Sequence, residues 1–322
     1  MSASGAAAAG HLPVLRDRVV ALLGPALRDR EAVLVDATLG RAGHASALLA
    51  EHPGLALVGI DADATAIEES ARLLAAFPGR VTLVQARYDE LAGILSRLGL
   101  RSVQGILFDL GVSSPQLDDR ERGFAYSYDA PLDMRMNTSG ELTAAQVLNT
   151  YPAADLTRVL RDYGEERFAR RIADAVVRER EAEPLTSTLR LAEIVRAAIP
   201  APARRTGGNP AKRTFQALRI EVNGELDALH RVLPDALDAI AVDGRIAVLA
   251  YHSLEDRAVK RALAQRTTDT TPKGLPVPLP ESQPQFRLLT RGAERPGDEE
   301  TAANPRAASA RLRAAQRVRA AA

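Results

Sequence analysis

Short apolar runs separated by helical patterns recur along the first third of the chain. Four such runs occupy residues 33–35, 55–60, 81–84 and 106–108. The first ends at Asp36 and the second at Asp61. Apolar strands that alternate with helices are typical of a parallel sheet with right-handed crossovers. This part of the sequence therefore predicts a doubly wound α/β domain.

The alternation stops in the middle of the chain. From about Ala153 to Ile199 the apolar positions follow helical spacing only, and Phe215 opens a long helix whose apolar side continues to Leu233. A strand over 245–251 then resumes the α/β pattern. We therefore expect one Rossmann-like domain with a mostly parallel sheet, interrupted by an inserted all-helical domain.

The domain boundaries follow from this pattern. We expect the Rossmann-like domain to take residues 10–115 and 215–322, and the inserted helical domain to take residues 116–214. Residues 1–9 and about 268–300 are expected to be flexible, since the segment 268–296 is rich in proline, threonine and glycine.

Charge changes this picture through its distribution. The net charge of the 322 residues is only +1, but Ile194–Ile220 carries six basic residues and no acid, and Asn304–Ala322 carries five arginines and no acid. Most charge runs are solvated faces, yet two acid-free basic stretches favour a polyanion partner.

The chain has no cysteine, which excludes disulfides, thiolate zinc sites and iron–sulfur clusters. It also excludes a thiol nucleophile, and we expect no metal site. The N-terminal stretch lacks a signal-peptide pattern, and no run of about twenty apolar residues occurs. We therefore expect a cytoplasmic protein without a membrane span.

A glycine-containing turn, Asp36–His44, lies between the first predicted strand and a helix. Such a turn is often only tight, but with Asp61 at the end of the next strand it favours a nucleoside cofactor whose ribose the acid binds. The G-x-G-x-x-G pattern and the G-x-x-x-x-G-K-[ST] phosphate loop are both missing. S-adenosylmethionine therefore fits better than NAD or ATP.

Asp109 and His252 each follow a predicted strand, so both are expected at the carboxyl edge of the sheet, where ligands bind. For His252 the alternative is an exposed residue before a helix cap made by Ser253 and Asp256. The loop Ser113–Gln116 is placed to grip a planar amine.

Three aromatic residues, Phe124, Tyr126 and Tyr128, follow this loop. They would stack on a flipped base or, as the better single-feature interpretation, form a small local core. Leu132–Met136 has the same two interpretations, the second being a buried methionine pair with a salt bridge.

Taken together, these stretches resemble the RsmH (MraW) family of 16S ribosomal RNA cytosine-N4 methyltransferases. The matching motifs run through nearly the whole chain in family order: HLPVL at 11–15, DATLG at 36–40, Gly43-His44, DLGVSSPQLD at 109–118, RGF at 122–124, PLDMRM at 131–136, YGEE at 163–166, FQALRI at 215–220, HSLEDR at 252–257 and NPR at 304–306. So long a set is highly specific.

The resemblance implies a class I S-adenosylmethionine-dependent methyltransferase fold with an inserted helical recognition domain. It implies S-adenosylmethionine as the cofactor, with contacts at Ala42, Gly43, His44, Asp61, Tyr88, Asp109 and Gln116. The implied activity is N4-methylation of a specific cytidine in the decoding region of 16S rRNA, within the small (30S) ribosomal subunit.

Four positions depart from the family pattern: Ala42 replaces a usual glycine, Asn209 a histidine, Lys212 a threonine and Tyr251 a phenylalanine. Because Ala42 replaces a glycine, the backbone path of the turn does not follow from the family pattern alone. Lys212 adds positive charge where RNA is expected. The oligomeric state is open, with a homodimer as one option.

The mechanism expected is direct attack of the cytosine amine on the methyl carbon. Asp109, Ser113 and Ser114 are the candidates for holding the amine, and His252 is a weaker candidate for taking up its proton. RNA contacts are expected at Arg135, Lys212, Arg213 and Arg219. Two alternatives remain at this point, an NAD-dependent oxidoreductase and a non-catalytic ribosome-assembly factor.

Overall fold

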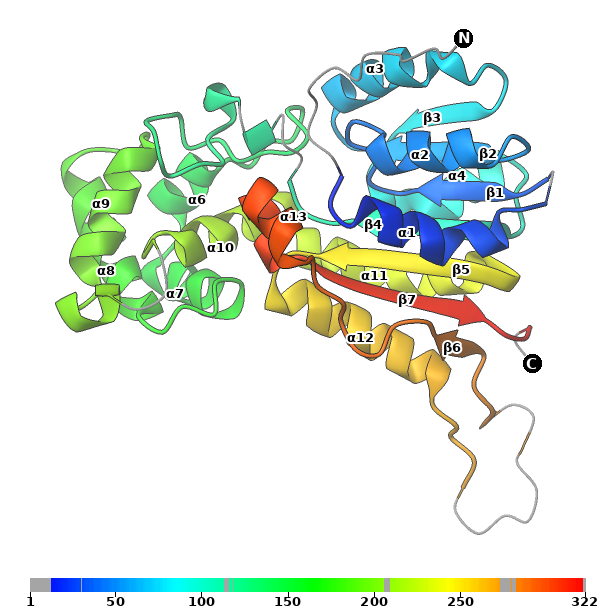
Figure 1. Cartoon of the computed structure of the whole chain (residues 1–322). Helices are drawn as coiled ribbons and strands as arrows, with labels where there is room; N and C mark the ends of the chain where they lie inside the picture. The colour runs from blue at the N-terminus through cyan, green and yellow to red at the C-terminus, as the bar shows by residue number, and fades with distance from the viewer. Residues whose placement is uncertain are drawn as a thin grey trace. The chain divides into compact units, whose positions relative to one another are not determined.

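The computed structural model describes residues 13–29, 31–112, 116–117, 119–205, 209–272, 279 and 282–320. Contacts divide the chain into two compact units, one made of Met1–Gly111 with Leu229–Ala322 and the other of Val112–Ala228. We call them the sheet unit and the helical unit (Figure 1). The helical unit thus starts before, and ends after, the 116–214 expected for the insertion.

The sheet unit contains one seven-stranded sheet in the order β3-β2-β1-β4-β5-β7-β6. Its strands are β1 Val33–Asp36, β2 Ala56–Asp61, β3 Val81–Gln85, β4 Val103–Asp109, β5 Ile240–Ala250, β6 Phe286–Leu288 and β7 Arg311–Arg317. The first five run parallel, and β7 is antiparallel to both β5 and β6. The expected doubly wound, mostly parallel α/β fold is therefore confirmed.

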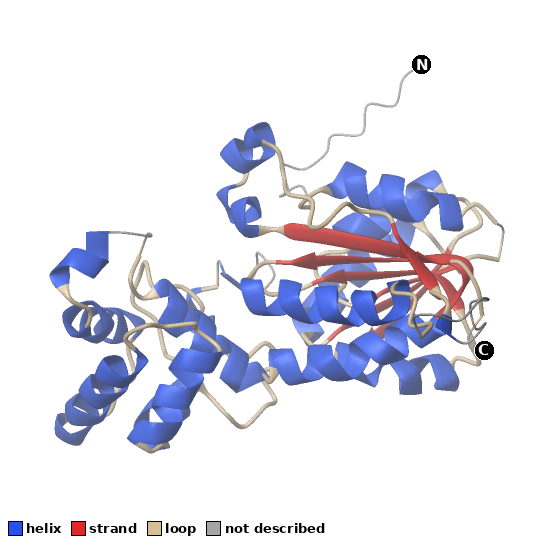
Figure 2. Ribbon diagram, turned by 90° about the horizontal axis from the view of Figure 1, so that it is seen from below, coloured by secondary structure: helices blue, strands red, loops and turns tan. Residues whose placement is uncertain are grey.

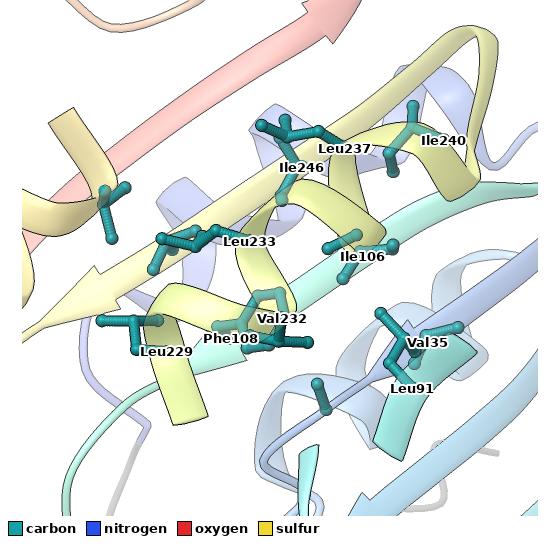
Figure 3. Close-up of a cluster of buried hydrophobic side chains, with 14 of the residues drawn as sticks. Val35, Leu91, Ile106, Phe108, Leu229, Val232, Leu233, Leu237, Ile240 and Ile246 are labelled. Atoms are coloured by element: carbon teal, nitrogen blue, oxygen red, sulfur yellow. The ribbon is translucent and has the colours of Figure 1, made fainter. Parts of the chain in front are cut away.

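Helices cover both faces of this sheet (Figure 2). The helices that do so are α1 Arg16–Leu23, α2 Gly43–Glu51, α3 Ala64–Leu73, α4 Leu91–Arg97, α11 Glu225–Ala239 and α12 Ser253–Thr267; α13 Asp298–Ala303, which has no buried residue, also belongs to the sheet unit. Both faces are apolar because successive strand residues point to opposite sides. In β4, Ile106 and Phe108 join the core that also holds Leu91 and Leu229 (Figure 3), whereas Leu107 joins the other core.

The helical unit consists of α6 Ala144–Thr150, α7 Ala153–Asp162, α8 Ala169–Ala182, α9 Thr188–Ala198 and α10 Lys212–Asn223, and it also includes the first residues of α11. The expected long helix from Phe215 is wrong in one respect. It is broken at Gly224, which takes the left-handed conformation (φ 59°) and caps α10 before α11 begins.

Part of the segment expected to be flexible is ordered. Within about 268–300, strand β6 pairs with β7 and buries Phe286, and α13 begins at Asp298. The composition did not reveal this edge strand because it has only three residues, Phe286–Leu288. Among the helices that the structure describes, none is long and apolar enough to cross a membrane.

The aromatic residues after the 109–118 motif form a local core. Phe124 is buried, and Tyr126 packs edge-on against Phe215 with ring centroids 5.5 Å apart. Met134 is fully buried, and Arg135 forms an ion pair with Asp133. The local-core interpretation is therefore confirmed over base stacking for Phe124, and a buried methionine with a salt bridge is found in the 132–136 segment.

Gly123 fixes the path of this part of the helical unit. It has a φ of 67°, and a Cβ atom at this position would lie 1.9 Å from the carbonyl oxygen of Pro131. The carbonyl of Arg122 also accepts the N–H of Met134, so the two segments are in direct contact. No residue except glycine fits here without moving the backbone.

We expect Gly123→Ala to destabilise the protein by at least about 2 kcal/mol, because left-handed strain and a backbone clash add. Urea denaturation measures the loss. Gly79→Ala is the matched control, since Gly79 has a φ of 73° and a Cβ atom added there would have no neighbour within 4 Å. Equal losses in the two variants would show that the clash contributes nothing.

Candidate active site

The loop after β1 turns back along the carboxyl edge of the sheet. Thr38 N donates to Asp36 Oδ1 at 3.2 Å, and Leu39 N donates to the carbonyl of Ile60 on β2 at 2.9 Å. Gly40 then adopts a left-handed conformation with a φ of 51°. The turn is thereby held between the ends of β1 and β2.

Ala42 and Gly43 lead from this turn into α2. Ala42, where the family pattern has glycine, is also left-handed (φ 54°) and is fully buried as the N-cap of α2. At Gly43 a Cβ atom would lie 2.3 Å from Pro13 Cγ. The neighbour that requires a glycine at this position is thus Pro13, which the sequence did not reveal.

Asp61, at the end of β2, ties the glycine turn to the sheet. Its Oδ2 accepts Gly40 N–H at 2.8 Å, and its Oδ1 accepts Asp63 N–H at 2.9 Å. Ser70 Oγ holds the other side of the turn by donating to the carbonyl of Gly40. Burial raises the pKa of Asp61, and the backbone N–H groups of Asp63, Gly40 and Ala62 oppose this rise. A carboxylate has roughly four acceptor sites, so Asp61 can accept a further donor.

Asp36 is the most deeply buried acid at this edge, with 2% of its surface exposed. Burial raises its pKa to about 7; the charge of His44 opposes the rise, and the charges of Asp109 and Asp61 add to it. The charges of Asp61 and Asp109 therefore act electrostatically on Asp36. The three carboxylates lie at the ends of β1, β2 and β4, which are neighbours in the sheet.

Asp109 is held through both its backbone and its side chain. Its N–H donates to Thr38 Oγ1, and Tyr251 Oη donates to its Oδ1 at 2.7 Å. Its Oδ2 lies 3.6 Å from His44 Nε2. Asp109 and His44, both predicted site residues, are therefore brought together, and Tyr251 joins them.

His44 is a buried polar residue that lacks hydrogen-bond partners among the described protein atoms. It is 4% exposed, and neither ring nitrogen makes a hydrogen bond to the described part of the chain. A buried imidazole without partners is costly, so this position is one where a bound group would supply a donor or an acceptor.

His252 acts as the N-cap of α12, so the expected Ser253–Asp256 cap is wrong by one residue. Its Nδ1 accepts Glu255 N–H at 3.4 Å, while Glu255 Oε2 accepts the N–H of Tyr251 and that of His252. Asp256 instead pairs with Arg313 on β7. The cap engages one ring nitrogen of His252, and Nε2 lies 3.1 Å from Glu255 Oε1, which weakens the case for His252 as a proton acceptor.

The remaining predicted residues are only partly placed. Tyr88 packs edge-on against Phe108, with ring centroids 6.0 Å apart, and Gln116 is buried in the helical unit. Ser113, Ser114 and Pro115 lie outside the described residues. Within the described chain, no cluster of three or more histidines and acids is arranged to hold a metal ion.

Two of the four predicted RNA contacts are engaged in ion pairs. Arg219 donates to both oxygens of Glu225, at 2.8 and 2.9 Å, so the expectation that the 194–220 cations lack a local acidic partner is wrong there. Arg135 likewise binds Asp133. Lys212 and Arg213 are exposed on the first turn of α10, and Arg213 Nη1 also donates to the carbonyl of Glu165 at 2.9 Å.

The arginines of the C-terminal stretch serve the fold. Arg313 and Arg311 bind Asp256, and Arg317 donates to the carbonyls of Asp238 and Ile240. Residues 311–317 form β7, inside the sheet. The expectation that this stretch favours a polyanion partner is therefore weakened for Arg311, Arg313 and Arg317, because these side chains bind groups distant in sequence.

The sequence reasoning did not assign three residues that build this site: Asp36, Thr38 and Tyr251. Asp36 and Tyr251 carried an available signal, since both stand at the carboxyl end of a predicted strand. Thr38 carried none, because its contact with Asp109 spans 71 residues.

A model of the MraW methylase family matches residues 8–318. The chain belongs to the MraW methylase family. Over 315 residues it is 63% identical to a protein of Thermobifida fusca named ribosomal RNA small subunit methyltransferase H, covering 98% of this chain and 96% of that protein. A Saccharopolyspora erythraea protein of the same name is 60% identical with the same coverage, and one from Frankia alni is 63% identical over 308 residues, covering 95% of each chain.

In this MraW family member, the raised pKa of Asp36 predicts a pH-dependent stability. Asp36 holds its proton up to about pH 7 in the folded state, whereas the unfolded chain releases that proton above about pH 4. The contribution of Asp36 to the free energy of unfolding is therefore highest below about pH 4 and decreases as the pH rises to about 7. Between pH 4 and 8 we expect Asp36→Asn to gain on the order of 3 kcal/mol relative to the wild type. Urea denaturation across this range measures it, and a constant difference would contradict it.

Proposed function

We propose that this protein transfers a methyl group from S-adenosylmethionine to the N4 amine of a cytidine in the decoding region of 16S rRNA, within the small (30S) ribosomal subunit. The observation that carries the proposal is the 63% identity, over nearly the full length of both chains, with a protein named ribosomal RNA small subunit methyltransferase H. The finer statement, the cytosine N4 position, follows from the family resemblance of the motifs.

The donor set at the carboxyl edge fits this cofactor. S-adenosylmethionine carries positive charge on its sulfur and its amino group. Asp61 and Asp109 supply negative charge around the glycine turn, and Asp36 adds to it when the pH lies above its raised pKa of about 7. A dinucleotide or triphosphate would instead add negative charge to this cluster. The absence of the phosphate-loop pattern from the sequence supports the same choice.

Each residue of the turn has a proposed role in holding the cofactor. Asp61 would accept a ribose hydroxyl at a remaining acceptor site of its carboxylate, as acids at the end of the second strand do in sheets of this kind. The buried ring of His44 would gain a partner. Tyr88, Ala42, Gly43 and Gln116 remain proposed contacts from the resemblance.

S-adenosylmethionine supplies, when bound, an electrophilic methyl group on a positively charged sulfur. The cytosine amine is a poor nucleophile because its lone pair is delocalised into the ring. Asp109 would accept a hydrogen bond from this amine on Oδ2, which helps its lone pair to localise as the new bond forms. Ser113 and Ser114 are proposed to hold the amine's other side, and Asp109 replaces His252 as our first candidate for receiving the proton.

An amine target also agrees with the composition. Methylation at carbon 5 of a pyrimidine ordinarily uses a cysteine nucleophile, and the chain contains no cysteine. Attack by an exocyclic amine needs only positioning and a proton acceptor, which carboxylates provide.

The proposed RNA contacts are now limited to Lys212 and Arg213. Both occupy the first turn of α10, which contains no acid. The helix dipole disfavours cations at this end, so their placement costs stability unless an anion is bound there. Phosphates would be stabilised by the two side chains and by the N–H groups of the helix terminus together.

The function is tested by incubating the protein with S-adenosylmethionine and small ribosomal subunits. The subunits come from a strain that lacks its own ribosomal RNA small subunit methyltransferase H, so that the target is unmethylated. Mass spectrometry of the rRNA nucleosides should show N4-methylcytidine. Asp109→Asn should lower the rate at least about 100-fold, because it removes the charge while keeping an acceptor for Tyr251. Subunit binding without methyl transfer would instead support an assembly factor.

Replacing Lys212 and Arg213 with glutamine should weaken binding to small subunits and reduce the slope of log K against log salt by about 1.5 to 2, since two phosphate contacts are lost. Filter binding at several salt concentrations measures the slope. The control is Arg161→Gln with Arg170→Gln, which removes the same charge from exposed side chains of the same unit. Equal effects in both pairs would show that only net charge matters.

A further inference from the structure

Tyr251 is the residue that orients the side chain of Asp109. Other contacts fix the backbone at this point: Asp109 N–H donates to Thr38 Oγ1, and Leu110 N–H donates to the carbonyl of Leu249 at 3.0 Å. The carboxylate can still rotate about its own bonds. Tyr251 Oη holds its Oδ1 at 2.7 Å, which leaves Oδ2 on the side of His44.

The hydroxyl of Tyr251 is suited to this task. Burial raises its pKa well above the ordinary value, and the charges of Asp109, Glu255 and Glu300 raise it further, so it remains a proton donor at all working pH values. Its backbone N–H is held by Glu255 Oε2 at 2.8 Å, and its ring packs against an apolar core. The donor is therefore placed by two contacts that do not involve Asp109.

We propose that Tyr251 is a positioning residue for methyl transfer, whose hydroxyl directs Asp109 Oδ2 toward the amine that receives the methyl group. This inference rests on the proposed function. The role belongs to this chain, because the phenylalanine of the family pattern keeps the ring and lacks the hydroxyl that binds Asp109.

Two single substitutions separate orientation from charge. Tyr251→Phe keeps the charge of Asp109 and removes the group that orients it. Asp109→Asn keeps an acceptor for Tyr251 and removes the charge. Because an interaction realised mainly in the transition state affects kcat more than ground-state binding, we expect Tyr251→Phe to lower kcat about tenfold and to change the Kd of S-adenosylmethionine less than about twofold.

A binding measurement makes the test independent of turnover. Sinefungin carries an ammonium group where S-adenosylmethionine carries its methyl group, so its affinity reports the position of the Asp109 carboxylate. By calorimetry, Tyr251→Phe should weaken sinefungin about tenfold and S-adenosylhomocysteine less than about twofold. Asp109→Asn should weaken sinefungin at least as much.

The outcomes are distinct. Unchanged sinefungin affinity in Tyr251→Phe overturns the positioning role. A lower melting temperature with equal weakening of all three ligands also overturns it, because that result indicates a merely structural residue. If the wild-type protein methylates no small subunit, the proposed function is overturned. If Tyr251→Phe still weakens sinefungin in that case, the orientation of Asp109 by Tyr251 remains supported.

Discussion

The concentration of negative charge at one edge of the sheet is the constraint on which the rest of the site depends. Adjacent parallel strands end side by side, so Asp36, Asp61 and Asp109 are brought together by topology alone. Like charges in a buried place repel and lose hydration. The sheet unit compensates with backbone N–H groups at Asp61, the hydroxyl of Tyr251 at Asp109 and a raised pKa at Asp36.

A buried histidine beside these carboxylates lacks hydrogen-bond partners among the described residues, and this favours a ligand-binding role for the site. His44 lies beside Asp109 with both ring nitrogens unbonded to the described chain. A site built only for stability would have replaced such groups with apolar side chains, because an unsatisfied buried polar group costs about 1–3 kcal/mol. A cationic ligand would relieve the repulsion among the carboxylates and supply partners in one step, so the cost is consistent with binding function.

Sequence predicted the sheet and the place of the site because both depend on local signals. Runs of apolar residues mark strands, and the acids after them mark the carboxyl edge. It predicted charges less well, because an ion pair requires a partner whose position is set by the fold. Arg219, a predicted RNA contact, instead forms an ion pair with Glu225, which lies six residues later and just beyond the end of the acid-free stretch. The alternative of an aromatic core was confirmed at Phe124, although the core itself includes Phe215, which is distant in sequence.

The C-terminal stretch shows why counting nearby acids fails in a doubly wound fold. β7 enters the sheet between β5 and β6, so its alternate residues face opposite layers. Arg313 meets Asp256, 57 residues earlier in the chain, and Arg317 donates to the carbonyl of Asp238 in the last turn of α11 and to that of Ile240 at the start of β5. A cation at a helix C-terminus is stabilised by the dipole, whereas Lys212 and Arg213 stand at a helix N-terminus, where it is not. Position relative to the helix end therefore separates Arg317, whose charge the dipole stabilises, from Lys212 and Arg213, whose charge a bound anion would stabilise.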